Sequence, residues 1–155
     1  MKKEGNKMPI TNYPDYMSPA GKAGQLSSYQ DYVADTYAVE ALVPFGAAVQ
    51  LNATGTAIKP IATGGTVIGI VLAQNIHDWV EKKDDQNYSV GEPAAIVKRG
   101  RIFVVAGGDI INGQAVKVDP VTQKFTTDGS IAVNNAVFKG NATADQLVEI
   151  EINLP

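Results

Sequence analysis

The chain has 155 residues, of which 45% are hydrophobic and 19% charged, proportions that predict a folded protein of one domain or one domain with an appendage. A net charge of −3 argues against a nucleic-acid partner, which normally selects a basic surface, and no apolar stretch is long enough to span a membrane. The absence of cysteine excludes disulfides and thiolate chemistry.

Residues 1–38 are predicted to form an extended N-terminal arm. Pro9, Pro14 and Pro19 recur at regular intervals, which excludes a helix and favours extended backbone. The segment also carries large side chains where no local core exists. It is therefore either a disordered tail or an arm that becomes ordered against a partner, with aromatic residues as anchors. On the second interpretation, the predicted partner contacts are Tyr13, Pro14, Tyr16, Met17 and Pro19.

Residues 27–42 fit two local structures. Ser28 followed by Asp31 resembles a helix capping box, and Tyr29 and Val33 share a helical face. Residues 36–42 are equally acceptable as a strand. A short turn or helix followed by a strand is the favoured interpretation.

Residues 39–155 are predicted to form a β-barrel-like body. Short apolar runs alternate with Gly and Asx turns, which is typical of a small barrel or sandwich of short antiparallel strands. The last run is the clearest, because Val148, Ile150 and Ile152 alternate with Glu149 and Glu151 as in a strand with one buried face. The predicted strands are 47–52, 57–61, 67–74, 94–98, 101–106, 114–118, 124–127, 135–138 and 147–154. The fold class is therefore all-β, with an extended N-terminal arm.

A short pattern, Gly-x-Ala-Val-x-aliphatic-Asx, occurs twice. It begins at Gly46 and again at Gly113, an offset of 67 residues (113 − 46). A turn and a second apolar position, Ile58 or Phe125, follow each copy. The pattern predicts one β-hairpin used twice in the fold.

The long loop 75–91 interrupts the strands and contains the only histidine, His77, and the only tryptophan, Trp79. It could carry a short helix around residues 78–83. A lone histidine without a nucleophile in a distinctive context predicts no catalytic residue. One histidine with no cysteine also lacks the ligands of zinc sites, and the acidic residues lack the EF-hand spacing. We expect no catalytic, metal or cofactor site.

The one basic cluster is Lys98-Arg99-Gly100-Arg101, between two predicted strands. Such a cluster could contact nucleic acid or an acidic partner. Because it contains a glycine between two strand-like runs, the polar tip of a hairpin is the favoured interpretation.

Several motifs occur in an order that resembles the structural cement, or head decoration, proteins of tailed bacteriophages. They are Pro44–Val49, Gly69–Val71, Tyr88–Pro93, Val97–Val104 and Ile111–Val116. The resemblance implies a non-enzymatic protein that binds the outside of the capsid and bridges neighbouring major capsid proteins, often as a dimer or trimer. It also implies synthesis in the host cytoplasm and a final place on the exterior of the virion.

An alternative function remains open on the sequence. The protein could be a carbohydrate- or receptor-binding β module on the virion surface. In that case Trp79 and Tyr88 of the long loop would stack on sugar rings.

Overall fold

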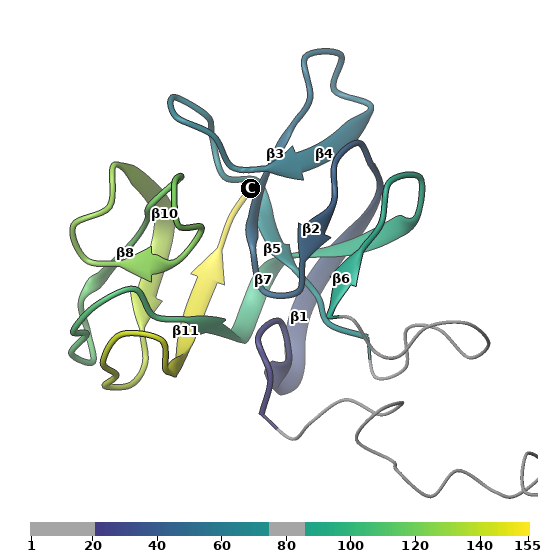
Figure 1. The fold of residues 1–155 in the computed structure, drawn as a ribbon. Coiled ribbons are helices and arrows are strands. Elements are labelled where there is room, and N and C mark those ends of the chain that lie inside the picture. Colours follow the sequence, from purple (N-terminus) through teal and green to yellow (C-terminus); the bar gives the residue numbers. More distant parts are fainter. Residues whose placement is uncertain (1–20, 75–85) are drawn as a thin grey trace, which may run out of the picture.

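The computed structural model describes residues 21–74 and 86–155, and this part of the chain is all-β, as predicted (Figure 1). Its strands are β1 (Leu26–Val39), β2 (Val43–Pro44), β3 (Ala48–Leu51), β4 (Ala57–Pro60), β5 (Gly69–Val71), β6 (Asn87–Tyr88), β7 (Pro93–Val105), β8 (Ala115–Val118), β9 (Phe125–Thr126), β10 (Ile131–Phe138) and β11 (Leu147–Asn153). Nine of them form one sheet, and β2 pairs with β6 in a second.

Strand pairing closes each half of the body into a ring. The first lobe has the order β1–β4–β3–β5–β7, and β7 returns to pair with β1. β7 then continues into the second lobe, β7–β11–β10–β8–β9, where a bridge between Ala106 and Phe125 joins β9 to the end of β7. Figure 1 shows the lobes side by side, with β8, β10 and β11 on one side and β1 to β6 on the other. The body is thus two small barrel-like units that share β7.

One contact in each ring is parallel, whereas the predicted strands are antiparallel. Ala38 and Val39 of β1 run parallel to Ala57 and Ile58 of β4, and the bridge between residues 106 and 125 is also parallel. The cause is topological. Around a closed ring of five strands the direction cannot alternate at every step, so at least one neighbouring pair must share a direction. The remaining paired strands are antiparallel.

Two apolar clusters fill the body because side chains alternate between the two faces of each strand. Val71 and Ile96 belong to the cluster inside the first lobe. Their neighbours Ile70 and Val97 belong to the cluster that fills the second lobe. Each fully buried side chain of this kind contributes about 1.5–3 kcal/mol. The two lobes are therefore joined by packed apolar side chains as well as by β7.

The pattern that occurs twice forms the same hairpin in both lobes. Leu51 pairs with Ile58 in the β3–β4 hairpin. Val118 pairs with Phe125 in the β8–β9 hairpin, 67 residues further along (118 − 51). This agrees with the predicted repetition of one hairpin design.

The repetition extends to backbone hydrogen bonds beyond the hairpin itself. Gly46 N donates to Val71 O at 2.9 Å, and Gly113 N donates to Phe138 O at 2.8 Å. Both glycines have positive φ, 79° and 97°, which glycine adopts without strain. The two copies thus share a backbone arrangement although few of their side chains match.

The basic cluster 98–101 lies within β7, so the prediction of two short strands joined by a hairpin tip there is wrong. At this point β7 changes its partner from β5 to β11. Gly100 has a φ of 138°, and a Cβ built there would lie 2.9 Å from the Cβ of Tyr32 in β1. The glycine therefore permits the close approach of two strands and does not mark a turn.

β1 begins at Leu26, so residues 26–38 of the predicted arm lie in the main sheet. They pair with β7, with a bulge between Ser28 and Val33, and the helical alternative for this segment is wrong. Pairing with a long strand outweighed the local helical pattern. Residues 1–20 lie outside the described part, so the arm itself stays a prediction. The same holds for the predicted helix at residues 78–83.

Candidate functional site

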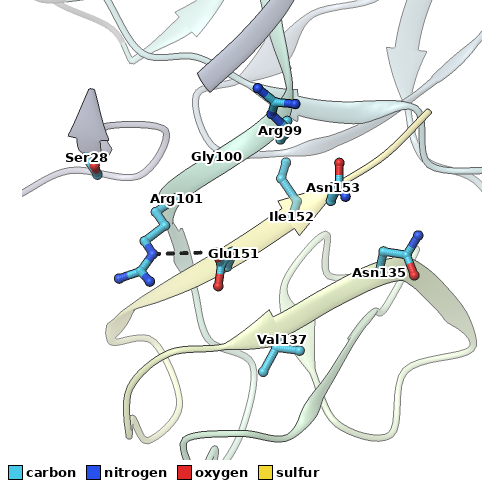
Figure 2. A pocket seen from close by; sticks show the side chains of 9 residues that line it. All are labelled: Ser28, Arg99, Gly100, Arg101, Asn135, Val137, Glu151, Ile152 and Asn153. Atoms are coloured by element: carbon cyan, nitrogen blue, oxygen red, sulfur yellow. Dashed lines mark ion pairs between the residues drawn. The ribbon is translucent and has the colours of Figure 1, made fainter. Parts of the chain in front are cut away.

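An open groove of about 1080 Å³ lies on the outer face of the second lobe (Figure 2). It crosses the sheet where β7, β11 and β10 are neighbours, with β1 at one rim. Its polar lining residues are Ser28, Arg99, Arg101, Asn135, Glu151 and Asn153. The site therefore brings the basic cluster of β7 beside the acidic side chains of β11.

Alternation along the strands places these side chains in the groove. In β11, Val148, Ile150 and Ile152 are buried, as predicted, which turns Glu151 and Asn153 to the outer face. The register of the sheet then sets these side chains beside their partners on β7. Arg101 pairs with Glu151, and Arg99 pairs with Asn153.

Ion pairs connect the charged residues of the groove with each other and with Lys139 and Glu149 beside it. Lys139 Nζ lies 3.1 Å from Glu151 Oε2, and this contact, together with Arg101, holds the pKa of Glu151 below its usual value. Arg101 lies 3.8 Å from a carboxylate oxygen of Glu149 and 3.8 Å from one of Glu151. Both distances are too long for hydrogen bonds, so these carboxylates attract the guanidinium without using its N–H donors.

The predicted arm contacts Tyr13, Pro14, Tyr16, Met17 and Pro19 lie outside the described residues, but the point where residues 1–20 join the body is described. Gly24 N donates to Phe103 O at 2.7 Å, and Ala73 N donates to Gly24 O at 2.8 Å. These bonds fix residue 24 between β5 and β7. The described part of the chain therefore begins at a hydrogen-bonded position beside β5 and β7.

The long loop joins the body beside the same position. The buried side chain of Lys22 donates from Nζ to the carbonyl of Gln74, and Nζ also lies 4.8 Å above the centre of the Phe45 ring. Phe45 N donates to Gln86 O at 2.9 Å. The described residues Lys22, Gln74 and Gln86 thus lie close together around Phe45.

Tyr88 does not have the surface position that the sugar-binding alternative requires. Its side chain is only 1% exposed, and its hydroxyl donates to Leu72 O at 2.9 Å. The Phe45 ring packs edge-on against it at 5.2 Å. A buried ring has no free face for a sugar, so Tyr88 is a core residue held by the pairing of β6 with β2. Trp79 and His77 lie outside the described residues.

Burial of the Tyr88 phenol raises its pKa. A hydrogen bond with the Ala95 backbone lowers the pKa in part, and the nearby Glu92 carboxylate raises it further. A raised pKa means that Tyr88 stabilises the fold fully below pH 10, and that this contribution is lost as pH rises through the folded-state pKa.

The change Tyr88→Phe is therefore expected to cost about 1–3 kcal/mol at neutral pH, because the Leu72 carbonyl loses its donor. It should also reduce the loss of stability above pH 10. Urea unfolding at several pH values measures both effects. The contact with Asp35 also raises the pKa of Lys98, but Lys98 is the same in both proteins, so its contribution to the pH dependence cancels in the comparison. A variant that is as sensitive to alkaline pH as the natural protein would contradict this account.

Neither a cluster of metal ligands nor a membrane-spanning helix is found among the described residues. No three acidic or histidine side chains among residues 21–74 and 86–155 come together as ligands for a metal ion. No helix in this part of the chain is long and apolar enough to cross a membrane.

Chains of two solved phage structures are similar to this chain. The chain is similar in fold to a chain of the structure described as the capsid of Myoviridae phage XM1, with a TM-score of 0.62, 16% identity, and coverage of 99% of this chain and 98% of that chain. A second similar chain is the head fibre gp8.5 N base of bacteriophage phi29, with a TM-score of 0.46, 18% identity, and coverage of 79% and 94%. The fold is thus one found in a phage capsid.

Residues 8–153 match the family described as structural cement protein (E217 gp24/Pam3 gp6), so the chain belongs to the phage structural cement protein family. This confirms the family that the sequence motifs suggest. The protein is accordingly a structural, capsid-associated protein of the virion. No curated protein sequence matches the chain.

Proposed function

We propose that the protein is a non-enzymatic cement that binds the exterior of the shell and bridges neighbouring major capsid proteins. The observation that carries this proposal is the match of residues 8–153 to the cement family. Two features of the body support it. The lobes share β7 and an apolar cluster, so both can bind the shell as parts of one rigid body. The groove offers polar side chains on an outer face, where a capsid protein can contact them.

Attachment at two or more points makes weak contacts sufficient. Once one site of a bridging protein is bound, the second binds at a high effective concentration. We place one contact on the body and another on the arm. If the arm adds as a strand to a neighbouring sheet edge, backbone hydrogen bonds supply affinity, and Tyr13, Tyr16 and Met17 fill pockets. Assembly as a dimer or trimer would multiply these contacts further.

A reconstruction of expanded shells with the purified protein added tests the bridging. We expect each bound copy to contact two neighbouring major capsid proteins from the outside. Contact with a single subunit, or binding to the inner surface, would contradict the proposal. Sedimentation of the free protein gives its oligomeric state. If the free protein is a monomer, a dimer or trimer can form only on the shell.

Removing residues 1–20 is expected to weaken attachment to shells at least about tenfold while leaving the thermal stability of the body unchanged. The described contacts begin at Gly21, so the hydrogen bonds of Gly24 would remain. Co-sedimentation with shells and thermal unfolding measure the two effects.

The matched control for this deletion is removal of residues 1–26. It also takes away Gly24 and the buried Leu26, and we expect it to destabilise the body. If the shorter deletion binds shells as tightly as the full chain, the arm is not a contact. If the deletion of residues 1–20 unfolds the body, these residues are part of the fold.

No observation on the described residues favours the carbohydrate- or receptor-binding alternative. Tyr88 is buried, and Trp79 is its only other proposed contact. We therefore retain the cement function alone.

A further inference from the structure

The groove of the second lobe contains more positive than negative charge. Two arginines, Arg99 and Arg101, line it together with a single carboxylate, that of Glu151, which leaves a surplus of one positive charge among the lining side chains (2 − 1). Lys139 and Glu149 lie beside the groove and add one charge of each sign. The whole chain has a net charge of −3. A locally positive groove on an acidic protein attracts an acidic ligand to this place in particular.

Arg101 provides the hydrogen-bond donors for such a ligand. Its two carboxylate neighbours are 3.8 Å away, and its side chain is 46% exposed. Glu151 is held by the shorter contact with Lys139, so it does not compete strongly for the guanidinium. An added carboxylate can therefore form the bidentate, charge-assisted pair that arginine favours.

The spacing of the side chains suits an extended segment. Arg99 and Arg101 stand two residues apart on β7, as do Glu151 and Asn153 on β11, so each pair is separated by about 6.6–6.8 Å. Side chains on one face of an extended peptide have the same period. The amides of Asn153 and, across the groove on β10, of Asn135 can both donate to and accept from a peptide backbone.

We propose that this groove binds an acidic, extended segment of the shell protein, with Arg101 as the main contact. Nucleic acid fits less well, because its unbroken row of phosphates would meet Glu149 and Glu151 on the same face. The identification of the shell as the source of the segment rests on the proposed cement function. The chemistry of the groove does not, so the two can be tested separately.

The first test uses the free protein. Probes are a labelled peptide of about eight residues that alternates glutamate with threonine, its counterpart with lysine in place of glutamate, and a single-stranded DNA of similar charge. We expect the glutamate peptide to bind best, and Arg101→Glu to lower its affinity about 10- to 100-fold, with Arg101→Lys between the two. Lys59→Glu, on β4 of the first lobe, makes the same change in charge and should bind normally. Equal binding of the two peptides, tighter binding of the DNA, or an unaffected Arg101→Glu protein would overturn the proposal.

The second test uses expanded shells and the same variants, after thermal unfolding has shown that each is folded. We expect Arg101→Glu to attach at least about tenfold more weakly than Lys59→Glu. If Arg101→Glu attaches normally, the groove is not the contact although the cement function stands. If the natural protein itself does not attach, the cement function fails, and the peptide experiment still decides the chemistry of the groove.

Discussion

Replacing Gly46 with alanine is expected to lower the free energy of unfolding by about 2–5 kcal/mol. The φ of Gly46 is 79°, and a Cβ there would lie 2.7 Å from Gly24 N and 2.8 Å from the Cβ of Ala23. Neither backbone can move freely, because Gly46 N is bonded to Val71 O and Gly24 N to Phe103 O. The added methyl group therefore causes both conformational strain and a clash. Urea-induced unfolding measures the loss.

The repeated hairpin supplies a matched control for this change. Gly113 occupies the position equivalent to Gly46 and has a φ of 97°, but a Cβ built there meets nothing within 4 Å. Gly113→Ala should therefore cost only the conformational strain, about 1–2 kcal/mol. Equal losses for the two variants would show that the contact between Gly46 and Gly24 is not tight.

Replacing the core residue of either hairpin is expected to destabilise the whole body. Phe125 and Ile58 are both buried but belong to different clusters, and Phe125→Ala should cost about 3–5 kcal/mol and Ile58→Ala about 2–5 kcal/mol. The two lobes share β7, and two side chains from strands of the first lobe, Ile70 and Val97, belong to the cluster of the second lobe. Each variant should therefore still unfold in a single transition.

Circular dichroism and hydrogen exchange of amides in each lobe test this expectation. The midpoints seen by the two methods should shift together in both variants. If Phe125→Ala unfolds the second lobe while the first stays protected, the lobes are separate folding units, and the contacts across β7 are weaker than the packing suggests.

Local patterns were sufficient to predict most strands. The alternation in residues 147–154 correctly placed Val148, Ile150 and Ile152 in the core. The repeated glycine pattern correctly predicted that one hairpin occurs twice. Both features depend on residues close together in the sequence, where side-chain period and turn chemistry decide the structure.

The errors arose where distant strands decide the structure. Gly100 amid charged residues has the local signs of a turn, yet it lies in a strand because it pairs with Ile152 of β11, close to Tyr32 of β1. Tyr88, in a polar stretch, is buried because β2 pairs with β6. Residues 26–38 joined the sheet because β7 pairs with Leu26, Ser28 and residues 33–38.

The groove could be predicted only in part. Alternation in β11 showed that Glu149 and Glu151 point away from the core, and the basic cluster of residues 98–101 was evident in the sequence. That the two face each other depends on the pairing of Arg101 with Glu151, a register between strands 50 residues apart (151 − 101). No local signal specifies such a register.

The most direct test of the cement function is the rupture of shells as the protein is added. Expanded shells that lack the protein are titrated with it, and their rupture is followed with rising temperature and with falling ionic strength. We expect the rupture temperature to rise and then level off when all sites are occupied, because bridges between subunits must break before the shell opens. Saturated binding with no gain in resistance to rupture would contradict the account, since the protein would then decorate the shell without stabilising it.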